Sequence, residues 1–198
     1  MIAYYCVEDP LSRSAMVRLV GDLVNDADLT ELQPNQGGYG PIKSKLKAYC
    51  QLANHHPVYL QTDLDRVECA PSLKRNWIDG AGLVEPLPEN LIFNIAVTEV
   101  EGWLLADRHN FSAFLGVSAA RLPLNAEIDD PKEFLINCVR THGNRSAKTN
   151  ILPTGNSKVG TGYNSFLCDF VETSWDFRSA SEHNASLERA IIRISETG

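Results

Sequence analysis

The sequence has no long apolar segment and no recognisable leader. Its longest apolar runs, such as residues 91–93 and 95–97, are far shorter than the about 20 apolar residues that a membrane-spanning helix needs. The first residues, Met1 to Val7, carry no basic stretch and no cleavage-site pattern, and they lead directly into Glu8 and Asp9. This start argues against a secretory signal. These absences predict a cytoplasmic protein without a membrane segment.

Cysteine and the common catalytic motifs are also scarce. The chain has 5 cysteines, an odd number, and no C-x-x-C pair, which argues against both a disulfide framework and a thiolate zinc site. It has no H-E-x-x-H zinc motif, no G-x-S-x-G nucleophile elbow and no P-loop. We therefore expect free thiols in a reducing compartment, and chemistry that depends on other residue types.

Basic residues are outnumbered by acidic ones. The 18 Lys and Arg against 25 Asp and Glu give a net charge of −7, whereas a protein that coats DNA by itself is usually basic. Contact with nucleic acid would need metal ions, a partner or a local basic patch. The most basic stretch contains Arg140, His142, Arg145 and Lys148. We interpret it as a solvated face, with nucleic-acid contact as the alternative.

What the sequence does have is an alternation of short β-prone segments with segments of helical periodicity. Strands are expected at 2–7, 29–32, 58–62 and 91–97, and helices at 11–24, 42–53, 71–77 and 99–107. This order predicts an α/β fold with a mainly parallel sheet and helices on both faces.

The second half of the chain has a different pattern. Helical periodicity dominates it, at 109–115, 131–140, 163–172 and 185–195. We predict an α/β core at 1–107 and a C-terminal helical extension at 108–198 that packs on the core as a single structural unit. The apolar residues expected to be largely buried are Trp103, Trp175, Leu187 and Ile191.

Acidic residues follow three of the four expected strands. Glu8 follows the first strand, Asp63 and Asp65 end the third, and Glu99 and Glu101 follow the fourth. Ligands of parallel α/β sheets gather outside the carboxyl ends of the strands, and two residues that are two apart in extended backbone share a face. Like charges so placed repel one another, and hard oxygen ligands suit Mg²⁺ or Mn²⁺. For any one acid alone, helix capping or solvated surface is the alternative.

The order of five segments resembles a known family. The segments are Val7-Glu8-Asp9, Gln61-Thr62-Asp63-Leu64-Asp65, Ile95 to Asp107, Asp130-Pro131-Lys132 and Asn184 to Arg189. Together they resemble the Toprim domain of topoisomerases, primases and overcoming-lysogenization-defect nucleases. The likeness is greater to a family of small bacterial Toprim-like proteins catalogued only as a domain of unknown function. The stretch from Glu101 to Asp107 is the most specific of these likenesses.

The resemblance implies a Toprim-like sheet and a Mg²⁺-dependent nuclease that acts on DNA or RNA. Glu8, Asp63 and Asp65 would bind the Mg²⁺ or Mn²⁺, with Glu101 as a further metal ligand or general base. It also implies a prokaryotic setting and an ATPase partner, in antiviral defence or a toxin-like role. The usual opening motif would place Gly at position 9 and Glu at position 12, where this chain has Asp9 and Ser12, so the second acid of the motif is missing or is replaced by Asp9.

Two other functions stay open. The acid missing at position 12 favours a metal-binding or degenerate scaffold subunit that regulates a partner ATPase. A nucleotide phosphohydrolase or transferase would use the same carboxylates on a small phosphate ester. Lys158, in the glycine-containing loop 153–162, could stabilise charge on a metal-bound phosphoryl group, with an ordinary connector as the alternative.

Overall fold

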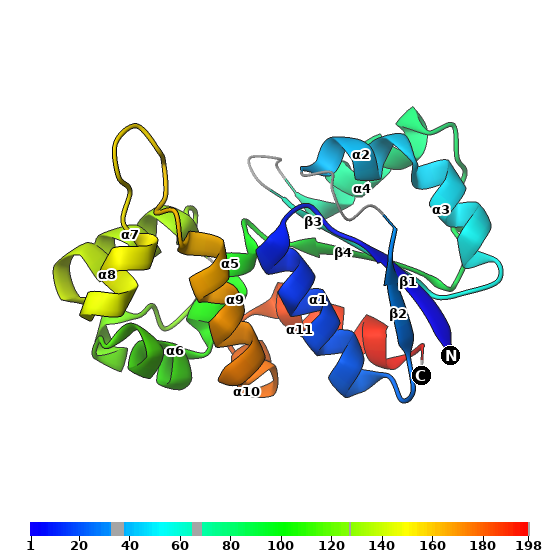
Figure 1. Ribbon diagram of the computed structural model, residues 1–198. Helices are drawn as coiled ribbons and strands as arrows, with labels where there is room; N and C mark the ends of the chain where they lie inside the picture. The colour runs from blue at the N-terminus through cyan, green and yellow to red at the C-terminus, as the bar shows by residue number, and fades with distance from the viewer. Residues whose placement is uncertain (33–37, 65–68, 127, 198) are drawn as a thin grey trace. The chain divides into compact units, whose positions relative to one another are not determined.

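The computed structural model describes residues 1–32, 38–64, 69–126 and 128–197. The strands in these ranges are β1 (Ile2–Cys6), β2 (Asp28–Glu31), β3 (Val58–Asp63) and β4 (Leu91–Ala96). They form an all-parallel sheet in the order β2-β1-β3-β4, with helices on both faces (Figure 1). The predicted α/β class, with a parallel sheet flanked by helices, is confirmed.

The helices occupy the segments with helical periodicity, together with some segments that the pattern did not predict. They are α1 (Pro10–Leu23), α2 (Tyr39–Ser44), α3 (Leu46–Ala53), α4 (Ala70–Gly80), α5 (Val100–Ala106), α6 (Arg108–Leu115), the 3₁₀ turn η1 (Ala119–Arg121), α7 (Pro131–His142), α8 (Arg145–Ile151), α9 (Tyr163–Thr173), α10 (Phe177–Ser181) and α11 (Ala185–Ser195). Helix α8 begins within the sequence Gly143-Asn144-Arg145-Ser146, which is typical of a turn. Its N-cap Asn144 accepts a hydrogen bond from the Ala147 amide at 2.8 Å. Asparagine favours both turns and helix starts, so the sequence alone does not distinguish the two.

The chain divides into two compact units. The first, here called the sheet unit, contains Met1–Val97 and Arg189–Gly198. The second, the helical unit, is the continuous segment Thr98–Glu188. The last ten residues therefore belong with the sheet, although they follow the helical unit in sequence. The predicted division into a core at 1–107 and an extension at 108–198 stays a prediction.

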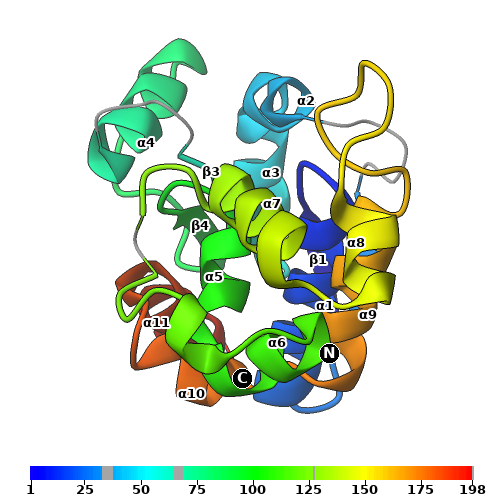
Figure 2. The same cartoon turned by 90° about the vertical axis from the view of Figure 1, so that its left-hand side faces the viewer.

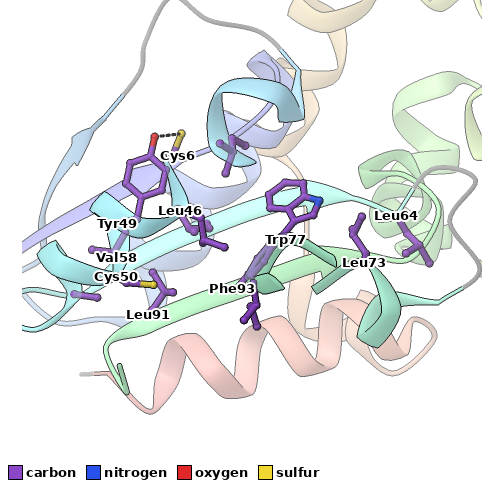
Figure 3. Close-up of a cluster of buried hydrophobic side chains, with 14 residues drawn as sticks. Cys6, Leu46, Tyr49, Cys50, Val58, Leu64, Leu73, Trp77, Leu91 and Phe93 are labelled. Carbon is purple, nitrogen blue, oxygen red and sulfur yellow. Dashed lines mark hydrogen bonds between the residues drawn. The ribbon is translucent and has the colours of Figure 1, made fainter. Parts of the chain in front are cut away.

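In the sheet unit, α2, α3 and α4 cover one face of the sheet, and α1 and the C-terminal part of α11 cover the other (Figure 1). On the first face Trp77 of α4 packs on Phe93 of β4, with 5.2 Å between ring centroids, and the Tyr49 hydroxyl donates to Cys6 Sγ at 3.5 Å (Figure 3). On the other face the Tyr59 hydroxyl lies 2.7 Å from Thr197 Oγ1. The side chains of alternate residues in each strand thus point to opposite faces of the sheet.

In the helical unit, α6 and α9 lie side by side (Figures 1 and 2). Phe111 and Phe114 of α6 pack against Phe170 of α9, with 4.6 and 5.2 Å between ring centroids. Of the four residues expected to be buried, Trp103, Trp175 and Leu187 are buried and Ile191 is half-buried. Among the described residues, no helix combines the length and apolar character needed to cross a membrane.

Candidate functional site

The strand order places the ends of β1 and β3 side by side at a point where the chain changes direction. From β1 the chain passes to β2 on one side, and β3 and β4 then add on the other side. In doubly wound folds, ligands bind beyond the carboxyl ends of the strands at such a switch point. Glu8 lies two residues beyond the end of β1, and Asp63 is the last residue of β3.

Glu8 is held against the end of β3. Its Oε1 accepts a hydrogen bond from the Thr62 hydroxyl and a second bond, at 3.2 Å, from the backbone amide of Asp63. The sheet register explains this contact, because Cys6 pairs with Leu60 and two further residues bring Glu8 level with Thr62. Beyond the last residue of β1, the Glu8 side chain therefore takes over the contact with the end of β3.

Asp63 is half-buried at the same strand end. Alternation along β3 sends its side chain to the face of Tyr59 and Gln61, opposite to that of Thr62. Glu8 and Asp63 thus lie at one edge of the sheet and approach it from different faces, and Asp65 is outside the described residues. Within the described ranges, no group of three or more His, Cys, Asp or Glu is arranged to hold a metal ion. The convergence of the three carboxylates on one ion stays a prediction.

Asp9 and Ser12, which replace the Gly and Glu of the usual opening motif, have local roles. The Asp9 carboxylate accepts from the amides of Leu11 and Ser12 at 2.8 and 3.0 Å, and the Ser12 hydroxyl donates to it at 3.2 Å. Asp9 is therefore the N-cap of α1, followed by Pro10 at the first helical position.

Glu101 belongs to the helical unit and is only 4% exposed. Its Oε1 accepts from the Tyr163 hydroxyl at 2.9 Å and lies 3.5 Å from Lys132 Nζ. Lys132 Nζ is also 3.0 Å from Glu99 Oε1. Burial raises the pKa of Glu101, Lys132 lowers it in part, and Glu99 raises it further. A carboxyl group in this setting keeps its proton to a higher pH than a surface glutamate, which suits proton transfer.

This burial gives a prediction for the pH dependence of stability. Below the ordinary pKa of 4.5, Glu101 is protonated in both the folded and the unfolded chain. As the pH rises, the unfolded chain loses this proton first, so the stability falls until the pH passes the raised pKa of the folded state. Glu101→Gln avoids the buried charge and keeps an acceptor for Tyr163. We expect it to melt like the wild type at pH 4, and at least about 2 °C higher at pH 8.

Thermal melts of both proteins across this pH range check the prediction. Glu182→Gln, at an exposed carboxylate, is the control and should show no gain that grows with pH. An E101Q protein that loses stability progressively as the pH rises would mean that the charged form of Glu101 is the stabilising one.

The other polar residues of the 101–107 stretch connect segments of the helical unit. Trp103 Nε1 donates to the Ser186 hydroxyl at 2.8 Å. The Asp107 carboxylate accepts from the Asp176 amide at 2.8 Å and from the Asn110 amide at 3.2 Å. This most specific part of the sequence therefore has well-defined structural roles.

Lys158 and the basic stretch also belong to the helical unit. Lys158 is exposed in the loop between α8 and α9, and Arg140, His142 and Arg145 are exposed at the end of α7 and the start of α8. The sequence pattern does not single out three residues that contact the candidate carboxylates, which are Thr62, Lys132 and Tyr163. Thr62 and Lys132 gave a local signal, because each lies in one of the five resembling segments.

Thr98, two residues after the end of β4, has an unusual backbone conformation. Thr98 has φ 67°, in the left-handed region that a β-branched residue rarely adopts. It precedes Glu99, the N-cap residue of α5. Strain of this kind persists only where the surrounding structure enforces it, and here it occurs where the chain leaves the sheet unit.

No protein-family model matches this chain, and no curated protein or solved structure matches it either. The resemblance to Toprim-like proteins therefore stays a prediction from the five segments alone.

Proposed function

We propose that this chain is a Mg²⁺- or Mn²⁺-dependent nuclease that cleaves phosphodiester bonds at the carboxyl edge of its sheet. The observation that carries the proposal is the position of Glu8. Its carboxylate is hydrogen-bonded to Thr62 and to the Asp63 amide at the β1–β3 switch point. Asp63 ends the neighbouring strand at the same edge, so a second carboxylate lies where ligands of doubly wound folds bind.

The donor set suits the proposed ion. Mg²⁺ commonly binds through one or two carboxylates, and waters and substrate phosphate oxygens complete its octahedron. Glu8 and Asp63 reach the edge from different faces, so they would supply these carboxylates to an ion at the strand ends, with Asp65 as the third. When bound, the ion supplies charge stabilisation at the phosphate and a more acidic water molecule. The hydrogen bonds from Thr62 and the Asp63 amide orient Glu8 for this role.

A second candidate, a metal-binding scaffold subunit that regulates an ATPase, is favoured by a different observation. Asp9 caps α1 and Ser12 donates to it, so neither position provides the further acid of the usual opening motif. The two candidates share the metal site and differ in whether cleavage follows.

The test compares Asp63→Asn and Glu8→Gln with Asp28→Asn. Asp28 is an exposed carboxylate at the amino end of β2, on the opposite edge of the sheet, so it is a matched control. At an ion concentration of 100 times Kd, binding should stabilise the wild type and D28N by about 2.7 kcal/mol, or about 5–11 °C in Tm. The two site variants should lose most of this gain.

Cleavage assays with Mg²⁺ or Mn²⁺, on DNA, RNA and nucleotide esters, then separate the functions. A nuclease should lose at least about 10- to 100-fold of its rate in D63N, because even residues that only support metal ligands contribute that much. Hydrolysis of nucleotide esters alone would identify a phosphohydrolase, and metal binding without cleavage, also with an ATPase partner present, would identify the scaffold. Identical melting of the wild type and D63N with and without metal would contradict all three functions.

A further inference from the structure

Two carboxamides are buried side by side inside the sheet unit. Gln61 of β3 and Asn94 of β4 are register partners, so their side chains share a face. Gln61 is 0% and Asn94 1% exposed. Within the described part of the chain, none of the four side-chain oxygen and nitrogen atoms has a hydrogen-bond partner.

Such a pair is unusual in a sheet core. Each carboxamide can donate two hydrogen bonds and accept two, and nearly all buried polar side chains in proteins are hydrogen-bonded. Their neighbours on the same face, Tyr59 and Ile92, follow the normal pattern, since Ile92 is apolar and the Tyr59 hydroxyl bonds to Thr197. Apolar residues of equal size would fill the two positions without a desolvation cost. Two adjacent exceptions to a core rule indicate a functional role.

The place of the pair suggests what that role is. Asp63 follows Gln61 by two residues on the same face of β3, which separates their Cα atoms by about 6.6 Å. The register partner of Asp63 is Ala96, which adds only a methyl group beside the carboxylate. An ionised carboxylate only accepts hydrogen bonds, whereas the amide groups and any water held between them can donate.

We infer that Gln61 and Asn94 are positioning residues that orient the Asp63 carboxylate for the divalent ion through one or two buried water molecules. The inference rests on the proposed function. Buried waters usually make about three hydrogen bonds to polar groups that the protein leaves unsatisfied, and two carboxamides beside a carboxylate provide enough partners. Metal-binding carboxylates are commonly held in this way by an outer set of hydrogen bonds.

The test uses a pair of double variants. Gln61→Met with Asn94→Leu removes both amides at nearly constant volume, and Gln61→Asn with Asn94→Gln exchanges them and keeps both. Titration calorimetry with MgCl₂ or MnCl₂ alone measures the Kd of each protein. We expect the apolar variant to bind the ion about 10- to 100-fold more weakly and the exchanged variant to stay within about 3-fold of the wild type. Asn94→Leu alone replaces the apolar variant if that protein does not fold.

The outcomes separate the inference from the proposed function. If the wild type binds the ion and the apolar variant binds it equally well, the positioning role is wrong and the metal site stands. If the wild type binds no ion, the proposed function is wrong, and the inference falls with it. A crystal structure of the wild type gives a further readout, because bridging waters or direct bonds should link the amides to Asp63. Amides that pair only with each other would overturn the inference.

Discussion

Replacing Trp103 by alanine is expected to lower the free energy of unfolding by about 3–5 kcal/mol, the usual cost of removing a fully buried large aromatic side chain. Trp103 is 0% exposed. Its indole donates to the Ser186 hydroxyl, which donates in turn to Asn184 Oδ1 at 2.8 Å. The substitution therefore leaves a cavity and also breaks a chain of buried hydrogen bonds. In a protein of this size the loss corresponds to a fall in Tm of about 6–20 °C.

Urea unfolding and thermal melts measure this loss, with Trp103→Phe as the matched variant. Phenylalanine keeps most of the apolar area and lacks the indole N–H, so it should lose clearly less, about 1–3 kcal/mol. A W103A protein that melts within 2 °C of the wild type, which is about 1 kcal/mol or less, would mean that the site repacks and that the Ser186 bond contributes little.

Gly160→Ala is expected to destabilise the chain by more than about 2 kcal/mol. An added Cβ would overlap the Asn150 carbonyl oxygen and lie 2.9 Å from the carbonyl carbon of Ile151. These are backbone atoms of α8 and cannot move away at low cost. The Gly160 amide also donates to the Ile151 carbonyl at 2.9 Å, so the chain is fixed at this point. The same contact anchors one end of the loop that carries Lys158.

Gly21→Ala is the control for this substitution. Gly21 lies in α1 and no atom would be within 4 Å of its new Cβ. Alanine is preferred over glycine inside a helix, so this variant should gain about 0.5–1 kcal/mol. Denaturant unfolding of both variants should give changes of opposite sign. A G160A protein as stable as G21A would show that the approach to α8 is not tight.

The strands and most helices were predictable because local sequence periodicity reflects burial. Val58 to Leu60 is apolar throughout, as a strand covered on both faces should be, and the structure buries all three residues completely. Helix α8 was missed because Gly143-Asn144 is typical of a turn as well as of a helix start. The left-handed backbone of Thr98 was not predictable, because nothing in a threonine favours positive φ.

The candidate site was predictable only in part. The expectation that Glu8 and Asp63 lie at one sheet edge follows from parallel pairing alone. The contact of Glu8 with Thr62 depends on the register of Cys6 with Leu60, which is set by packing over the whole sheet. In sequence Glu101 resembles the other strand-end acids, yet the structure buries it against Tyr163, 62 residues away. Long-range burial of this kind leaves no local pattern.

The return of the last residues to the sheet unit has a consequence for synthesis on the ribosome. Tyr59 pairs with Thr197, and the Phe93 carbonyl accepts a bond from Arg193 at 3.2 Å. The helical unit is continuous, so all of its residues are translated before those partners exist. Domains generally fold in the order in which they emerge. Here α1 can cover its part of that sheet face early, but the part that α11 covers stays open until the last residues are made, and nascent-chain chaperones would meet that part.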